Sequence, residues 1–252
     1  MTQADDTKDK PMDIHKPKPI HNWRELLTEI GVIVVGVAIA LSAEQGVEWL
    51  HNRAKAAEAR AGIREEIAEN LAYMQRRDAT EACIARRLDE VQGLIVAAAA
   101  GKLPQDALWI GIPVGAVINA GKYKAAVQSG AVSLFDDKEQ AIYSNIYTAF
   151  DVYITSYMNE FDDWANLRTL EAHPPASPVL DWQLRSALGL ARQHRWAVQA
   201  TRLVALRTAA EVGLAPGHWQ KVRMSETCVP LHTSREAAVK MTFAPEWGLA
   251  PP

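Results

Sequence analysis

The chain has 252 residues, a formal net charge of −3 and 48% hydrophobic residues. This length is enough for one or two domains with a sizeable core. Because the charge is nearly balanced, the chain has no general attraction to nucleic acid or to an acidic surface, and no nucleic-acid partner is expected. Alanine together with many glutamates and arginines favours helix over strand. The composition therefore predicts an all-α protein.

Changes in composition divide the chain into four parts. Residues 1–22 carry prolines and charges without an apolar period, which predicts a disordered tail. A transmembrane helix is predicted at 23–50 and an extramembrane helical domain at 51–212. Residues 213–252 mix proline and glycine with scattered apolar residues, so a mostly irregular C-terminal segment is expected.

The predicted transmembrane helix centres on fourteen uncharged residues, Ile30 to Ala43, between Glu29 and Glu44. Such a run spans about 21 Å of helix, short of the roughly 30 Å hydrocarbon core of a bilayer. Apolar residues continue on both sides, however, as far as Trp23 and Trp49, which lie about 39 Å apart along a helix. Since tryptophan concentrates at both membrane interfaces, these two residues are predicted to anchor the span.

Two other interpretations of this run stay open. A cleaved signal peptide fits the apolar length and the small residues at 40–43, but Glu25 and Glu29 occupy the place of its usual positive charges. A buried helix of a soluble protein is the common meaning of an apolar stretch of about 10 to 14 residues. Residues 30–41 are apolar on every side, so this alternative requires a core around the whole helix.

Orientation and association depend on the flanks and on one helix face. Basic residues balance on the two sides of the run, so the positive-inside rule does not decide. A short tail before a large domain favours a cytoplasmic N-terminus and a periplasmic domain at the inner membrane of a Gram-negative bacterium. Gly36, Ala40 and Ala43 share a wheel face with Glu29, and small residues at this spacing favour helix association in lipid. The expected partners are the lipid bilayer and a second copy, as a homo-oligomer.

A helical pattern then continues without proline to about Ala100, with apolar residues mostly three or four apart. Gly101 is predicted to end this helix. Residues 107–135 are rich in glycine, which predicts short, kinked helices, with a strand pair as the weaker alternative.

Two further amphipathic helices are predicted in the second half of the chain. The first starts near Asp136 or Asp137 as N-cap and runs to about Ala172, and the second covers 179–212. A short turn joins them, so an antiparallel hairpin is expected, packed with the long helix as an elongated bundle. The first is mostly acidic and the second is rich in arginine, which favours their pairing, although each exposed ion pair contributes little.

The two cysteines, Cys83 and Cys228, lie far apart and match neither a CxxC motif nor a metal-binding spacing. They are either two unrelated buried thiols or one long-range disulfide. A disulfide would tie the C-terminal segment to the long helix, and an oxidising compartment such as the periplasm would favour it.

The sequence contains no motif that predicts a catalytic, cofactor or metal site. "GAVINAGKY" from Gly115 resembles a phosphate-binding loop, but its glycine spacing is too long and Tyr123 replaces the Ser or Thr that binds magnesium. His194 is expected to be a solvated or interface side chain, and Ser129 lacks the surroundings of a nucleophile elbow. We therefore expect neither a cofactor nor an enzymatic activity.

The aromatic and acidic residues of the helix predicted from Asp136 or Asp137 to about Ala172 could either pack in the core or form a site. The tyrosines at positions 143, 147, 153 and 157 have the spacing of helix-packing residues, with an aromatic ligand cage as the alternative. Asp162 and Asp163 diverge on a helix and are predicted to form a solvated face rather than an acid–base pair.

The segment from Trp23 to Leu41, of the form "W…E-I-x-V-I-V-x-G-V-x-I-A-L", resembles the start of certain bacterial single-pass membrane proteins of unknown function. The likeness continues through a polar helix, the Ser129-Gly130 turn and the tyrosine-rich "YSNIYTAFDVY", to about residue 170. It implies a membrane-anchored helical protein and no activity, substrate or catalytic residue.

These features together predict an interaction or scaffold protein at the inner membrane. An extracytoplasmic sensor or ligand-binding helical module, with the Tyr/Trp-rich helix lining its site, is the alternative.

Overall fold

A computed structural model describes residues 23–115, 117–218 and 225–242, and in these residues all regular structure is helical. Six α-helices and three short 3-10 helices are present, and no strand occurs in the described ranges, so the all-α prediction is confirmed. The predicted tail at 1–22 lies outside them. The chain divides into two compact units, one ending at His51 and the other beginning at Asn52.

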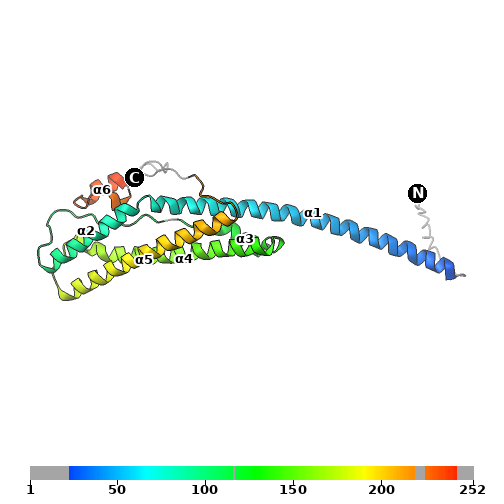
Figure 1. Cartoon of the computed structure of the whole chain (residues 1–252), viewed down its shortest axis with the longest axis horizontal. Coiled ribbons are helices and arrows are strands. Elements are labelled where there is room, and N and C mark those ends of the chain that lie inside the picture. The colour runs from blue at the N-terminus through cyan, green and yellow to red at the C-terminus, as the bar shows by residue number, and fades with distance from the viewer. Residues whose placement is uncertain (1–22, 116, 219–224, 243–252) are drawn as a thin grey trace, which may run out of the picture. The chain divides into compact units, whose positions relative to one another are not determined.

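The first unit consists of the N-terminal part of α1 (Trp23–Asp78), drawn in blue in Figure 1. Every side chain from Leu27 to His51 is exposed, on all sides of the helix. The hydroxyls of Thr28 and Ser42 donate hydrogen bonds to carbonyl oxygens four residues earlier, at 2.9 and 2.7 Å. These polar groups are therefore satisfied within the helix and need no water.

The second part of α1 belongs to the second unit and buries one stripe. Ile63, Ile67, Leu71 and Met74 recur at helical spacing and are fully buried. The helix ends at Asp78, and α2 (Glu81–Ala99) begins after a two-residue turn, so the prediction of one continuous helix to about Ala100 is wrong. At this turn the Thr80 hydroxyl donates to the Arg77 carbonyl oxygen at 2.8 Å. Such a side-chain bond competes with the backbone hydrogen bonds that would continue the helix.

The predicted hairpin is formed by α4 (Asp137–Leu167) and α5 (Pro178–Glu211), which run side by side in Figure 1. The Asp136 side chain caps α4 by accepting from the Glu139 amide at 2.9 Å, and Ser177 caps α5 in the same way. A 3-10 turn, η2 (Arg168–Ala172), continues α4 to the end that the sequence predicts.

The hairpin packs against α1 and then against α2, which follow each other along it. One core cluster joins the second part of α1 to α4 and the later half of α5. The other joins α2 to the end of α4 and the earlier half of α5. A three-helix bundle thus continues past the break in α1 because α2 takes over as the third helix.

The remaining elements are short. An irregular segment runs from Gly101, whose positive φ ends α2 as predicted, to α3 (Gly121–Gln128) and η1 (Val132–Leu134). In the C-terminal segment, the described residues include η3 (Glu226–Cys228) and α6 (Arg235–Thr242). The strand pair considered for 107–135 does not form in the described residues. Instead, side chains of the helices satisfy many backbone groups of this segment.

Candidate functional site

The residues predicted to contact lipid lie on the exposed first unit. Trp23 and Trp49 are both exposed, as are Glu29, Ala40 and Ala43. A Cβ added at Gly36 would meet no atom within 4 Å, so this position is open to another helix. By length and composition, this helix can cross a membrane.

The two cysteines form a disulfide in the structure, with an S–S distance of 2.01 Å and a sequence separation of 145. Cys83 lies in the first turns of α2, and Cys228 ends η3. The bond therefore holds the C-terminal segment against α2.

Arg87, one helical turn after Cys83, strengthens this attachment. Its side chain is fully buried and donates to the carbonyl oxygens of Trp109, Ile110 and Val229, at 2.7 Å for Ile110. Burial lowers the pKa of Arg87, and the ion pair with Glu90 at 2.7 Å opposes that shift. One guanidinium group thus joins two irregular segments to α2, which is a structural role.

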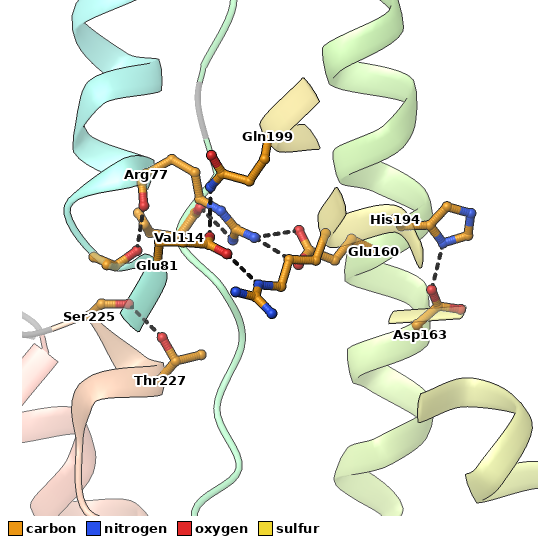
Figure 2. Close-up of polar contacts among 11 residues, drawn as sticks. Arg77, Glu81, Val114, Glu160, Asp163, His194, Gln199, Ser225 and Thr227 are labelled. Atoms are coloured by element: carbon orange, nitrogen blue, oxygen red, sulfur yellow. Dashed lines mark hydrogen bonds and ion pairs between the residues drawn. The ribbon is translucent and has the colours of Figure 1, made fainter. Parts of the chain in front are cut away.

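A second buried arginine connects α1 to α4 (Figure 2). Arg77 donates to both carboxylate oxygens of Glu160, at 2.7 and 2.8 Å, and to the Val114 carbonyl oxygen at 3.2 Å. Both side chains are fully buried. Burial raises the pKa of Glu160, and the positive charge of Arg77 opposes that shift. Nearby, Glu81 of α2 pairs with Arg195 and accepts from Gln199 of α5 at 2.7 Å. These charges hold helices together at the break after α1.

The segment that resembles a phosphate-binding loop is occupied by a carboxylate of the chain itself. Glu66 is 3% exposed and accepts from the amides of Lys122 and Tyr123, at 2.8 and 3.2 Å. The Tyr147 hydroxyl also donates to Glu66, at 2.5 Å. Glu66 therefore caps the start of α3, where a phosphate would have to bind.

The tyrosines of α4 pack in the core. Tyr143, Tyr147 and Tyr153 are buried, and Tyr157 is half-buried beside them. Tyr147 stacks on Tyr123 with ring centroids 4.1 Å apart. This is the packing arrangement that their spacing predicts.

The prediction for Asp163 is wrong, because this residue is buried while Asp162 is exposed. Its carboxylate lies 2.7 Å from Nδ1 of His194 on α5, as Figure 2 shows. Burial raises the pKa of Asp163, and His194 opposes that shift. The pair joins the two arms of the hairpin. Sequence periodicity on one helix could not reveal a partner 31 residues away.

The outward face of α5 carries an uncharged series that the sequence prediction did not identify; it is apolar except at Ser186, Gly189 and Gln193. The series follows alternating steps of three and four residues, the spacing of a helix–helix seam: Val179, Trp182, Ser186, Gly189, Gln193, Trp196, Ala200 and Leu203. All are exposed except Ala200, which is half-buried; Trp182 and Trp196 expose 69% and 70% of their surface. None carries a charge. We call these eight residues the α5 outer series.

The α5 outer series lies opposite the core side of the helix. Leu184, Leu188, Ala191, Val198 and Ala205 have the same spacing and are buried against the bundle. With 3.6 residues per turn, the two series lie about half a turn apart. The helix thus has an apolar face that the bundle covers and, opposite to it, an uncharged face that the bundle leaves exposed.

Two surface hollows lie beside the α5 outer series, between α5 and α4. One, of about 340 Å³, is lined by Ser186, Leu190 and Trp182 with Asn166 of α4. The other, of about 450 Å³, is lined by Ala200 and Val204 with Val152 of α4. Each hollow is next to a small residue of the series.

Among the described residues, no group of three or more His, Cys, Asp or Glu side chains could hold a metal ion. Comparison of the chain with protein-family models, curated proteins and solved structures finds no match. The resemblance to bacterial single-pass proteins therefore stays a prediction.

Proposed function

We propose that this is a single-pass membrane protein of the bacterial inner membrane, whose periplasmic helical domain serves as an interaction or scaffold module rather than an enzyme. The first unit supports the proposed membrane anchor most directly, because its apolar helix exposes its side chains on every side. A soluble protein rarely exposes so much contiguous apolar surface. A bilayer would cover all of it.

The length and ends of this helix support the same proposal. Between Trp23 and Trp49 the helix measures about 39 Å, close to the thickness of a bilayer with its interfaces. The glutamates at 29 and 44 lie about 11 Å from the midpoint near Gly36, where they reach toward the headgroups.

The disulfide between Cys83 and Cys228 supports a periplasmic domain, because disulfides persist in oxidising compartments and are rare in the cytosol. An interaction role is supported by the uncharged α5 outer series with its two exposed tryptophans. Depletion of charge and enrichment of tryptophan are typical of the centre of protein interfaces. The buried charges, in contrast, are paired with each other or with backbone groups and hold the bundle together.

Alkaline carbonate extraction of membranes from cells that express the full chain tests the anchor. We expect the intact chain to stay in the membrane pellet. A double variant, Val34→Arg with Val37→Arg, should lose insertion, because each central arginine costs about 2.5–3.5 kcal/mol. Ala54→Arg with Ala57→Arg adds the same charges at exposed positions beyond the span and should behave as the unaltered chain.

Mass spectrometry of the same fractions separates the alternatives. A chain released into the supernatant, or a chain shortened by removal of its first forty or so residues, would contradict the proposed anchor.

A further inference from the structure

We propose that a second copy of this chain binds to the α5 outer series, with the two α5 helices packed side by side and antiparallel. This inference deepens the proposed interaction function and rests on it. It starts from the second face of α5, because an uncharged seam that exposes two tryptophans is typical of a helix that packs against a further partner.

The order of large and small residues in the series indicates which partner fits. The series alternates between the two heptad positions a and d. In an antiparallel helix pair, a residue at position a packs against a residue at position d of the facing helix. One alignment then sets Trp182 against Ala200 of the second copy, and Trp196 against Ser186 of the second copy. The same alignment pairs Val179 with Leu203 and Gly189 with Gln193. Each tryptophan therefore faces a small residue, and every pair occurs twice by symmetry.

The hollows on the surface agree with this alignment. Trp196 of the second copy would approach Ser186, beside the hollow of about 340 Å³. Trp182 of the second copy would approach Ala200, beside the hollow of about 450 Å³. Both hollows are open at the surface, so a side chain that protrudes from a second copy can enter each of them. The surface thus offers a receiving site for each of its own protruding side chains.

A parallel, in-register pair fits less well. It would place each tryptophan against its own copy and Gly189 against Gly189, so the large side chains would crowd while the glycine layer left a void. Packing of large residues against small ones avoids both problems.

Charge and area allow this contact. The arginines that flank the series, Arg185 and Arg192, are already paired with Asp181 and Asp89, at 2.9 Å each. Two copies would together bury four largely exposed indoles as well as the exposed Val152, Leu190 and Val204 that line the two hollows. That amounts to on the order of 1,000 Å², the lower end of specific interfaces.

Cysteine cross-linking of the full chain in mild detergent tests the inference. One preparation carries Val179→Cys and the other Leu203→Cys, with different tags, and the two are mixed before mild oxidation. The native cysteines are bonded to each other, so the introduced thiols are the reactive ones. We expect a heterotypic Val179→Cys to Leu203→Cys product. Homotypic products should be absent, since identical sites lie about 36 Å apart along an antiparallel pair.

A tryptophan variant tests the contact further, and a methionine variant outside the series serves as its control. Trp196→Ser in both preparations should weaken self-association by at least about 30-fold and remove the cross-link. Met158→Ser replaces a half-exposed apolar residue of α4 outside the series and should leave the cross-link intact. Both variants should keep the helical circular dichroism of the parent, because both side chains lie at the surface.

Homotypic products, the absence of any product, or equal yields with Trp196→Ser would overturn the inference. Carbonate extraction is scored separately, so a chain that stays in the membrane without cross-linking would leave the proposed anchor in place. A chain that cross-links as expected but leaves the membrane would refute the anchor alone.

Discussion

Two tyrosines of α4 allow a matched test of how the buried polar groups contribute to stability. Tyr147→Phe and Tyr153→Phe each remove one hydroxyl from a buried side chain of the same helix. The Tyr147 hydroxyl donates to Glu66 at 2.5 Å, whereas the Tyr153 hydroxyl has no hydrogen-bond partner among the described residues. Burial raises the pKa of both groups, so each stays protonated at neutral pH.

The two substitutions should change the free energy of unfolding differently, with a loss for Tyr147→Phe and no loss for Tyr153→Phe. Tyr147→Phe leaves the nearly buried carboxylate of Glu66 with its two amide donors only, and a hydrogen bond to a charged group is worth about 1.5–3 kcal/mol. The stacking on Tyr123 survives, because phenylalanine keeps the ring. Tyr153→Phe removes a hydroxyl whose burial is uncompensated, so stability should stay equal or rise by up to about 1 kcal/mol.

Thermal unfolding of the full chain in detergent measures both effects. For a domain of this size, 1 kcal/mol corresponds to about 2–4 °C in Tm. Tyr147→Phe should therefore lower Tm by roughly 3–12 °C, while Tyr153→Phe should leave it unchanged or slightly raised. Equal losses in both variants would refute the assignment of the Tyr147 hydroxyl to Glu66.

Three further predictions concern other parts of the chain. The hydrogen bond from Arg60 holds the pKa of Glu139 below its ordinary 4.5, so this pair stabilises the fold above about pH 4.5 and loses its effect as the pH falls through the lowered value. In urea titrations, Glu139→Gln should therefore reduce the change in the free energy of unfolding across this pH range by less than about 1 kcal/mol. An unchanged pH profile would contradict the pairing. Cys83→Ser should lower the free energy of unfolding by about 2–5 kcal/mol, because the bond to Cys228 closes a long loop; thiol titration of denatured, non-reduced native protein should find no free thiol, and two would refute the bond. Gly36→Leu should weaken self-association in a membrane reporter assay, and an unchanged signal would rule out this face.

Much of the helical layout could be predicted from local patterns. The N-cap at Asp136, the end of α2 near Gly101 and the hairpin of α4 with α5 each depend on residues close in sequence, and the structure confirms all three. The break between α1 and α2 differs from the predicted continuous helix, and its one local signal is that the apolar series jumps from Met74 to Cys83 at this point.

The polar interior could be predicted less well, because its partners are distant in sequence. Arg77 and Arg87 each occupy an apolar register of their helix, which signals a buried charge but does not name Glu160 or the carbonyl of Val229 as its partner. Loop segments that contact these groups have no period of their own. For the same reason the pairing of Asp163 with His194 could not be read from either helix alone.

The α5 outer series, in contrast, was present in the sequence as a second heptad pattern. A pattern that assigns one apolar face to each helix does not include it, because the core face of α5 already accounts for one such series. Trp182 and Trp196 are 14 residues apart, two full heptads, and mark the second face without any structure.

In the proposed topology, the helix from Trp23 to Leu50 crosses the inner membrane and the bundle lies in the periplasm. Fusion of alkaline phosphatase, which needs an oxidising compartment, to the C-terminus of the full chain tests it most directly. We predict an active, membrane-bound phosphatase on an unshortened chain. An inactive fusion, or an active one released from the membrane, would contradict this topology.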